Sequence, residues 1–395
     1  MNDASHNHGE QENTVSTYSV DVETLQQIAL KGDAQALFQL AINYEQGRGV
    51  AENQQEAFYC YQQAAELGHV TAQLNLGWAY SNGIGAPQDN DKAFYWYRKA
   101  AEQGHPTAQF DLGFCYVNGL GVEKDEHQAI GWYKKAAEQG HAVAQLNLGW
   151  IYANSPSRKN WEQAVYWYKQ AAEQGDPRAQ YNGAWCYGKG RGTPKNPRKA
   201  AYWYEEAAMQ NHATAQYNLG WCYENGFGVE PDLDKALVWY HKSALQGQIT
   251  AQYTLGWCYG NGRGMEVDMA KAVHWYTKAA EQGHTTAQLN LGWCHLNGKG
   301  TPVNREEALK WYLKAAEQGN ATAMFNVGNC YAHGYGIEQD DKQAEEWYLK
   351  AVRHGNKKAA SALRHLASKQ EKEKKRTRRT EKSFSCLPPR EIPSP

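Results

Sequence analysis

The sequence predicts an all-α fold, an α-solenoid superhelix of about nine helix–turn–helix repeats, each 36 residues long. The first observation is a closing glycine, replaced once by Asn211, that recurs at positions 32, 68, 104, 140, 175, 211, 247, 283, 319 and 355. Every step between these positions is 36 residues except one of 35, and a fixed period in this range is typical of solenoids. The second observation is a shared segment of the type AQYNLGWCYENGFGV, which is residues 215–229.

The shared segment has the spacing of an amphipathic helix. In the copy that starts at Ala72, the apolar residues Leu76, Ala79 and Tyr80 return to one face of a helix. The GxG sequence that follows supplies the positive φ angles that end a helix.

A second helix follows each GxG sequence, for example in KAFYWYRKAAEQG at residues 92–104. Its small and aromatic residues again follow helical spacing. The closing glycine would end this helix, and Asn211 is the other residue type that adopts the left-handed conformation readily. Each repeat is therefore predicted to be a helix–turn–helix pair that stacks on its neighbours.

The residue after the closing glycine is predicted to cap the next first helix. This position holds histidine in five repeats and Asp or Asn, both good N-cap residues, in others. The histidines are therefore interpreted as capping groups and not as metal ligands. The histidines are His69, His105, His141, His212 and His284, and the Asp and Asn residues at this position are Asp33, Asp176, Asn320 and Asn356.

The pattern AxxLGxxYxxGxGV…AxxWYxxAAxxG resembles the Sel-one-like repeat family of the tetratricopeptide superfamily. The resemblance covers about Gly32–Gly355 in nine copies. It implies a superhelical adaptor that holds other proteins, but it assigns no role to a particular residue. It also brings a remote alternative, the β-lactam hydrolysis once proposed for cysteine-rich relatives.

Three domains are predicted. Residues 1–20 are polar and are expected to be disordered. Residues 21–368 form the solenoid with a capping helix at each end, the first capped by Asp21 with Val22, Leu25 and Ile28 facing inward. Residues 369–395 are expected to be a basic and then proline-rich disordered tail. No segment is apolar over the length needed to cross a membrane.

Charge is divided unevenly along the chain. Residues 369–395 contain nine Lys and Arg and four Asp and Glu, which is a net charge of +5. Because the formal net charge of the whole chain is −1, residues 1–368 carry −6. An acidic solenoid is a poor partner for nucleic acid, so none is expected, and the expected location is the cytoplasm. The tail contains a cluster that resembles a nuclear localisation signal, Lys374, Lys375, Arg376, Arg378 and Arg379. Alternatively, this run is a solvated end of the chain. A further hypothesis is that the tail contacts the solenoid's own aromatic surface.

The sequence contains no feature typical of an enzyme, a metal site or a cofactor site. Six of the eight cysteines share one position in the first helix, which Ala79 and Ile151 fill elsewhere. One thiol per repeat at a small apolar position indicates buried free cysteines in a reducing compartment. No catalytic residue, metal ligand or cofactor is predicted.

An aromatic residue directly after Leu-Gly lies opposite the packed face of the first helix and is expected to line a concave wall. With tyrosines four residues before it and asparagines four residues after it, this row is a candidate clamp for an extended peptide. The predicted partner-binding residues are Trp78, Phe114, Trp150, Trp185, Trp221, Trp257, Trp293, Tyr181, Tyr217, Tyr253, Asn82, Asn118, Asn154, Asn225, Asn261 and Asn297.

Two functions of a non-catalytic protein remain open at this point. The favoured one is an adaptor that holds an extended segment of a protein or peptide partner on the tryptophan and asparagine rows. The alternative is an architectural protein that assembles complexes through its outer surface. Exposed tryptophans would favour the adaptor, whereas tryptophans that interlock, with asparagines that only start the turn, would favour the alternative.

Overall fold

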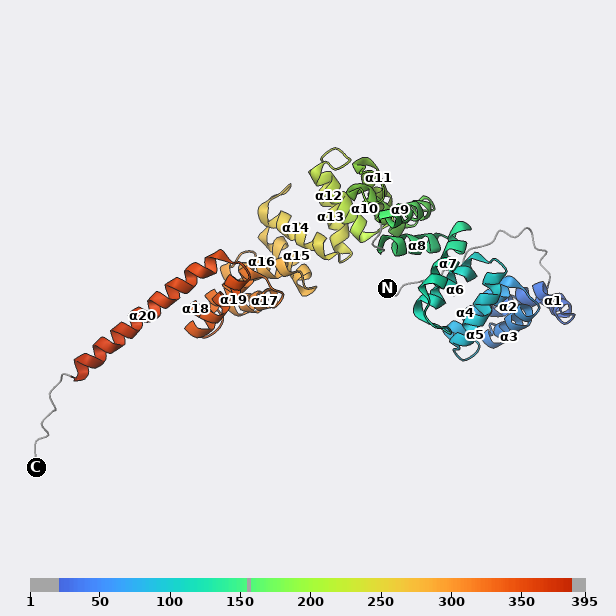
Figure 1. The fold of residues 1–395 in the computed structure, drawn as a ribbon, viewed down its shortest axis with the longest axis horizontal. Helices are drawn as coiled ribbons and strands as arrows, with labels where there is room; N and C mark the ends of the chain where they lie inside the picture. The colour runs from blue at the N-terminus through green and yellow to red at the C-terminus, as the bar shows by residue number, and fades with distance from the viewer. Residues whose placement is uncertain (1–20, 155–157, 386–395) are drawn as a thin grey trace, which may run out of the picture. The chain divides into compact units, whose positions relative to one another are not determined.

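The structure, a computed structural model, describes residues 21–154 and 158–385, where it contains helices joined by turns and no strand (Figure 1). The chain divides into two compact units, Met1–Lys195 and Asn196–Pro395. Within each unit, every helix contacts the helix before it and the helix after it. This is the all-α solenoid architecture that the sequence predicts.

The helices of the described residues form two series. The first unit contains α1 (Val22–Ala29), α2 (Ala34–Gln46), α3 (Gln54–Glu66), α4 (Val70–Asn82), α5 (Asn90–Glu102), α6 (Pro106–Asn118), α7 (Glu126–Glu138), α8 (Ala142–Asn154), α9 (Arg158–Glu173) and α10 (Pro177–Lys189). The second unit contains α11 (Pro197–Met209), α12 (Ala213–Asn225), α13 (Leu233–Leu245), α14 (Ile249–Asn261), α15 (Met269–Glu281), α16 (Thr285–Asn297), α17 (Arg305–Glu317), α18 (Ala321–His333), α19 (Asp341–Arg353) and α20 (Lys357–Ser385).

The two helices of a repeat approach closely where the first helix carries the glycine of Leu-Gly. A Cβ atom on Gly256 would lie 2.6 Å from the ring of Tyr276, which is buried on the second helix. The same glycine–tyrosine contact occurs in most other repeats. In the fifth repeat, Gly183 and Ala184 stand at the Leu and Gly positions. The glycine therefore sets the spacing of the helix pair, which explains why a residue of poor helix propensity stands inside a helix.

The second glycine of each GxG sequence contacts the preceding repeat. Gly228 has a φ of +78°, and a Cβ atom there would lie 2.1 Å from the backbone oxygen of Pro197 at the start of α11. Both the positive φ and the close backbone contact require glycine. The turn therefore fixes the position of its own repeat against the previous one.

A buried glutamine joins successive repeats. Gln216, at the start of α12, donates from Nε2 to the backbone oxygen of Ala208 in α11 at 3.1 Å. Its Oε1 accepts from Nε2 of Gln246, at the end of α13, at 2.7 Å. Glutamine occupies this position in seven repeats, always 5% exposed or less: Gln73, Gln109, Gln145, Gln180, Gln216, Gln252 and Gln288. Met324 replaces it in the last repeat, so the last joint lacks this side-chain amide.

The tryptophans of the second helices contribute to the contact between repeats. Trp275 of α15 is 6% exposed and packs on Ala236 and Tyr240 of the preceding repeat and on Leu255 of its own repeat. Trp311 packs in the same way on the buried cluster that contains Ala272 and Tyr276 of the repeat before it. Lys278 and Lys314 lie over the two rings, with Nζ 5.9 and 4.3 Å from the ring centres.

Both ends of the solenoid carry the predicted capping helices, with two differences. In α1, Asp21 accepts from the backbone nitrogen of Thr24 at 2.8 Å and Leu25 is buried, but Ile28 is 37% exposed because a single covering helix has only one packed side. At the other end, α20 continues to Ser385, past Lys369, where the sequence analysis expected disorder to begin.

The continuation of α20 has a local cause. Lys, Glu, Arg and Gln dominate this stretch and are good helix formers. Lys369 also pairs with Asp341 of α19 at 3.1 Å, and Lys375 pairs with Glu371 at 2.9 Å. The basic cluster that begins at Lys374 thus lies within a helix, and its roles as an import signal and as an intramolecular ligand stay predictions. The expectations for residues 1–20 and 386–395 fall outside the described residues.

Candidate functional site

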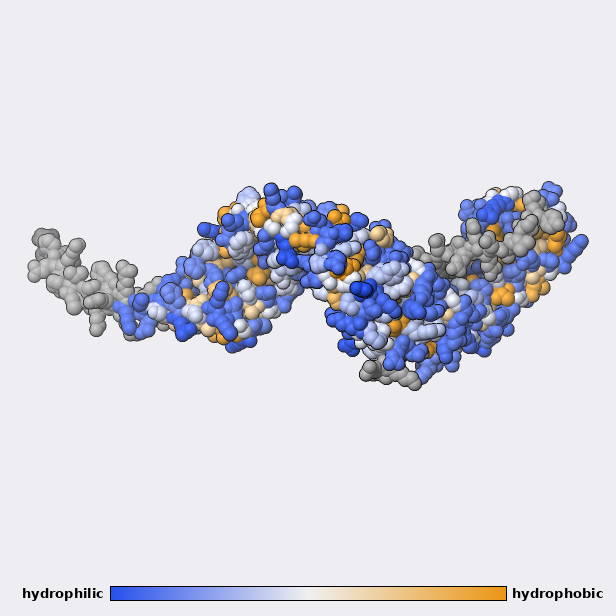
Figure 2. Space-filling view, turned by 90° about the horizontal axis from the view of Figure 1, so that it is seen from above, coloured by the Kyte–Doolittle hydropathy of each residue, from blue (hydrophilic) through white to orange (hydrophobic). Residues whose placement is uncertain are grey.

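Aromatic side chains of the first helices are exposed in both units. The first-unit row comprises Trp78, Phe114, Trp150 and Trp185, and the second-unit row comprises Trp221, Trp257 and Trp293. Phe114 and Trp150 are 42% and 48% exposed, and the three residues of the second-unit row are 39–46% exposed. Trp78 and Trp185 are half-buried. The face of the molecule drawn in Figure 2 is mainly hydrophilic, with separate hydrophobic patches.

The tryptophans of the second-unit row are not interlocked. Among the described residues, no ring contact joins Trp221, Trp257 and Trp293 to one another, while Trp221 contacts Phe227 at 5.4 Å between ring centres. In the first unit, Trp185 contacts Trp161 of α9 at 5.7 Å, and Trp161 has no counterpart in other repeats. The second-unit row is therefore the more regular of the two exposed rows.

The asparagines of the predicted clamp are exposed, but each already makes one hydrogen bond. The Asn225 Nδ2 group donates to the backbone oxygen of Trp221 at 2.9 Å. The same bond, 2.8–2.9 Å long, is made by Asn82, Asn118, Asn154, Asn261 and Asn297. The bond lies in the last turns of the helix and fixes the side-chain amide. One N–H group and the amide oxygen remain for a ligand.

The predicted tyrosines lie mainly between repeats. Tyr217 and Tyr253 are half-buried, and the Tyr253 ring stacks on His284 with ring centres 4.4 Å apart. Burial raises the pKa of Tyr253, and the nearby side chain of Asn290 in the next first helix opposes this rise. Tyr181 is also half-buried. Tyr217 and Tyr253 thus pack against other aromatic rings and do not extend the exposed row.

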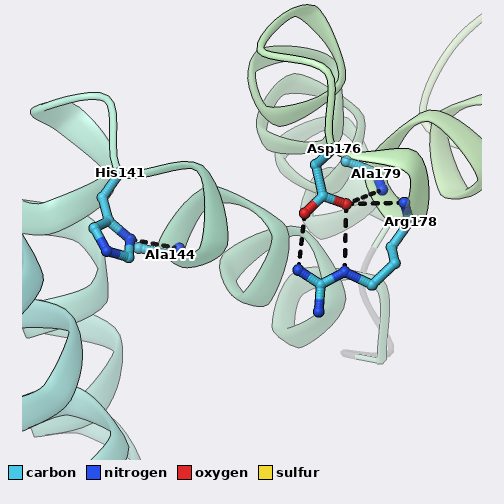
Figure 3. A network of polar contacts seen from close by, with 5 residues as sticks. All are labelled: His141, Ala144, Asp176, Arg178 and Ala179. Carbon is cyan, nitrogen blue, oxygen red and sulfur yellow. Dashed lines mark hydrogen bonds and ion pairs between the residues drawn. The ribbon is translucent and has the colours of Figure 1, made fainter. Parts of the chain in front are cut away.

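The histidines after the closing glycine form N-caps, as predicted. The His141 Nδ1 atom accepts from the backbone nitrogen of Ala144 at 3.2 Å, and Asp176 occupies the same position one repeat later (Figure 3). His69, His212 and His284 cap in the same way. His105 makes no side-chain cap bond. An acceptor Nδ1 atom requires a neutral imidazole.

This requirement predicts a loss of stability in mild acid. Burial lowers the pKa of His69 and of His284 from the ordinary value of about 6.5. The folded state thus favours the neutral form, so the stabilisation is complete above pH 6.5 and declines as the pH falls toward the lowered pKa values. We expect the double variant His69→Asn, His284→Asn to lose less stability between pH 7 and pH 5 than the unmodified chain, by about 1 kcal/mol per cap.

Asparagine is the matched replacement because Asn320 caps α18 at the equivalent position without titrating. Urea unfolding at a series of pH values measures the difference between the two proteins. Parallel losses of stability would contradict the role given to the histidine caps.

The sequence analysis missed a set of residues beside the second-unit row. The residue between the two glycines of GxG is Phe227 in one repeat and Arg263 in the next. Phe227 contacts Trp221, and Arg263 pairs with Glu224 at 2.8 Å, one residue before Asn225. The available signal was a chemically variable position within an otherwise repeated turn.

Seven cysteines are free and buried in the described residues. Burial raises the pKa of Cys115, Cys186 and Cys222 to about 12, so the thiols are protonated at neutral pH. In the same part of the chain, no group of three or more His, Cys, Asp or Glu side chains could hold a metal ion. No described helix has the length and apolar character of a membrane span.

Comparison with known proteins places this geometry in a family. The Sel1 repeat profile matches nine consecutive segments, residues 34–69, 70–105, 106–141, 142–176, 177–212, 213–248, 249–284, 285–320 and 321–356. Comparison with curated proteins gave no match.

Two solved structures share the repeat. A Sel1 repeat protein from Oxalobacter formigenes is 34% identical, with a TM-score of 0.62, over 78% of this chain and 89% of that chain. The protective antigen c5321 of uropathogenic Escherichia coli, which displays an SLR fold, is 29% identical over 95% of this chain and 99% of that chain, with a TM-score of 0.47. The match of nine successive repeats covers most of the sequence, and the chain therefore belongs to the Sel1 repeat family.

Proposed function

We propose that this chain is a non-catalytic protein-binding adaptor that holds an extended segment of a partner on the second-unit row. Sel1 and related helical repeats generally mediate protein–protein interactions. The observation that carries the proposal is the exposure of Trp221, Trp257 and Trp293 without contact among them. Large exposed aromatic side chains at regular spacing are typical of contact surfaces, where tryptophan is enriched among the residues that dominate binding energy.

The asparagines give the proposed surface a way to hold a main chain. The bond from Nδ2 to the helix carbonyl fixes each amide of Asn225, Asn261 and Asn297. The amide oxygen can then accept from a backbone N–H group of the partner, and the second Nδ2 hydrogen can be donated. Because main-chain contacts do not depend on side-chain identity, such a surface binds extended segments with modest sequence preference.

An architectural function through the second helices remains the second candidate. A separate set of aromatic residues is exposed there: Tyr59, Tyr95 and Tyr166 in the first unit and Tyr202 in the second are 50–56% exposed. Val238 continues the position in the second unit at 54%. A protein that assembles complexes through its outer surface would use these residues and not the tryptophan rows.

The two candidates are separated by a capture experiment with matched variants of the full chain. One variant carries Trp221→Ala and Trp257→Ala in the second-unit row. The control carries Tyr202→Ala and Val238→Ala, which remove exposed apolar side chains from second helices of the same unit. Proteins captured from native lysate by each form are quantified by mass spectrometry, after unfolding measurements show that both variants are folded.

The adaptor proposal expects the tryptophan variant to lose the captured partners and the control variant to keep them. Removal of one central tryptophan at an interface commonly weakens binding by about 2 kcal/mol or more. Retention by the tryptophan variant, with loss by the control, would instead favour the architectural function.

A further inference from the structure

The residue between the glycines of each GxG sequence occupies an equivalent position in the repeats of the second unit. The flanking glycines have nearly the same φ angles in each case, 65° and 78° at Phe227 and 68° and 72° at Arg263. The Phe227 ring lies against Trp221, so this position borders the second-unit row. In chain order the position holds Phe227, Arg263, Lys299 and Tyr335, which places two cationic residues between two aromatic ones.

Arg263 is held in place by the preceding repeat. Its Nε atom donates to Oε1 of Glu224 at 2.8 Å, and the other oxygen of Glu224 accepts from the hydroxyl group of Tyr240 at 2.7 Å. The Glu224 side chain is 17% exposed and the Arg263 side chain is 46% exposed. Within the described part of the chain, the two terminal nitrogens of Arg263 have no hydrogen-bond partner. They form a positioned donor pair of the kind that matches a carboxylate group.

Lys299 provides the second cation, one repeat further on. It follows Trp293 by the same six residues that separate Arg263 from Trp257. Lys299 is exposed and makes no ion pair with another described residue. Glu224 is engaged by Arg263 and Tyr240 and offsets one of the two positive charges, so Arg263, Lys299 and Glu224 together carry one net positive charge.

We propose that Arg263 and Lys299 make the second-unit row selective for an acidic extended segment of a partner protein, a proposal that rests on the protein-binding function above. Helices in contact lie about 10 Å apart, and an extended chain advances about 3.3 Å per residue. Two carboxylates about three residues apart would therefore face the two cations. Apolar side chains between them would lie on Trp257 and Trp293.

The test is a selection with the full-length protein from a displayed library of random peptides. Peptides of about twelve residues reach about 40 Å when extended, enough to pass several repeats. Three forms of the chain are compared: the unmodified chain, the variant Arg263→Glu with Lys299→Glu, and the variant Trp257→Ala with Trp293→Ala. Fluorescence anisotropy of one selected peptide then measures the effect of Lys299→Glu alone. Lys299 is exposed and makes no ion pair with another described residue, so we expect its replacement to leave the unfolding curve unchanged.

The expected result is enrichment of Asp and Glu about three residues apart with the unmodified chain, and of Lys and Arg with the charge-reversed variant. Lys299→Glu should weaken binding of an acidic peptide about tenfold. The same variant should bind more tightly to a version of that peptide in which Lys replaces the acidic residues. Enrichment without acidic residues that still depends on Trp257 and Trp293 would overturn the charge selectivity and leave the adaptor function in place. Enrichment that survives the tryptophan variant would overturn both. Selectivity for an acidic segment would also be contradicted if no peptide were enriched. A competition with heparin, a polyanion, gives a further check, because equal displacement of bound peptide from all three forms would contradict the selectivity as well.

Discussion

Replacement of Trp275 by alanine is expected to lower the free energy of unfolding by about 3–5 kcal/mol. Trp275 is 6% exposed, and it fills the space between Leu255 of its own repeat and the Ala236 and Tyr240 side chains of the preceding one. The substitution would leave a cavity at a joint between repeats, where a solenoid gains most of its stability. Urea unfolding followed by circular dichroism measures the loss.

Trp221→Ala is the matched control, because it removes the same side chain from the exposed row. Trp221 is 42% exposed, so its replacement should cost less than about 1 kcal/mol. Trp293, which is 46% exposed, should behave alike. If Trp221→Ala and Trp275→Ala cost the same, the row is part of the structural core, and the proposed adaptor function loses its main support.

Replacement of Gln216 by alanine is expected to cost about 2–4 kcal/mol, although glutamine is a polar residue. Gln216 is 1% exposed, and alanine would remove its hydrogen bond to Ala208 of the preceding repeat and its bond with Gln246 of its own repeat, and leave a cavity. The Ala208 oxygen keeps a bond from the backbone nitrogen of Asn211, and Gln246 can turn to solvent. These remaining interactions keep the loss below that of a fully unpaired buried amide.

Methionine separates the effect of volume from that of hydrogen bonding, because Met324 occupies this position in the last repeat. Gln216→Met should cost about half as much as Gln216→Ala, since it fills most of the space without making the bonds. The reverse change, Met324→Gln, should be neutral or stabilising because the new amide can donate to the backbone oxygen of Ala316. Equal stability of the unmodified chain and both Gln216 variants would show that the glutamines do not hold the repeats together.

The repeat register and most of its local chemistry were predictable from the sequence. Period, GxG turns and N-caps depend on contacts within a few residues, so the pattern at His69 or Asp176 contains what is needed to interpret it. The bond from Asn225 to the Trp221 carbonyl also connects residues four apart in one helix, and helix geometry allows it. The sequence analysis assigned these asparagines to a ligand or to the start of the turn and did not predict this bond.

The features that the sequence did not reveal depend on contacts between repeats or on competing tendencies. Gln216 is polar, and its burial makes sense only with the Ala208 oxygen and the Gln246 amide in place. Arg263 gains its importance from Glu224, which lies 39 residues earlier. The extension of α20 shows that helix propensity, together with the ion pair between Lys369 and Asp341 of α19, outweighed the charge composition that suggested disorder.

The glutamine joints have a consequence for how such a chain changes in evolution. In seven repeats the same amide joins the same backbone carbonyl of the preceding helix. Duplication or deletion of one 36-residue segment therefore brings together two surfaces that already fit each other. The array can gain or lose modules by unequal recombination without a new interface, while substitutions at the variable turn positions diversify what each module offers to a ligand.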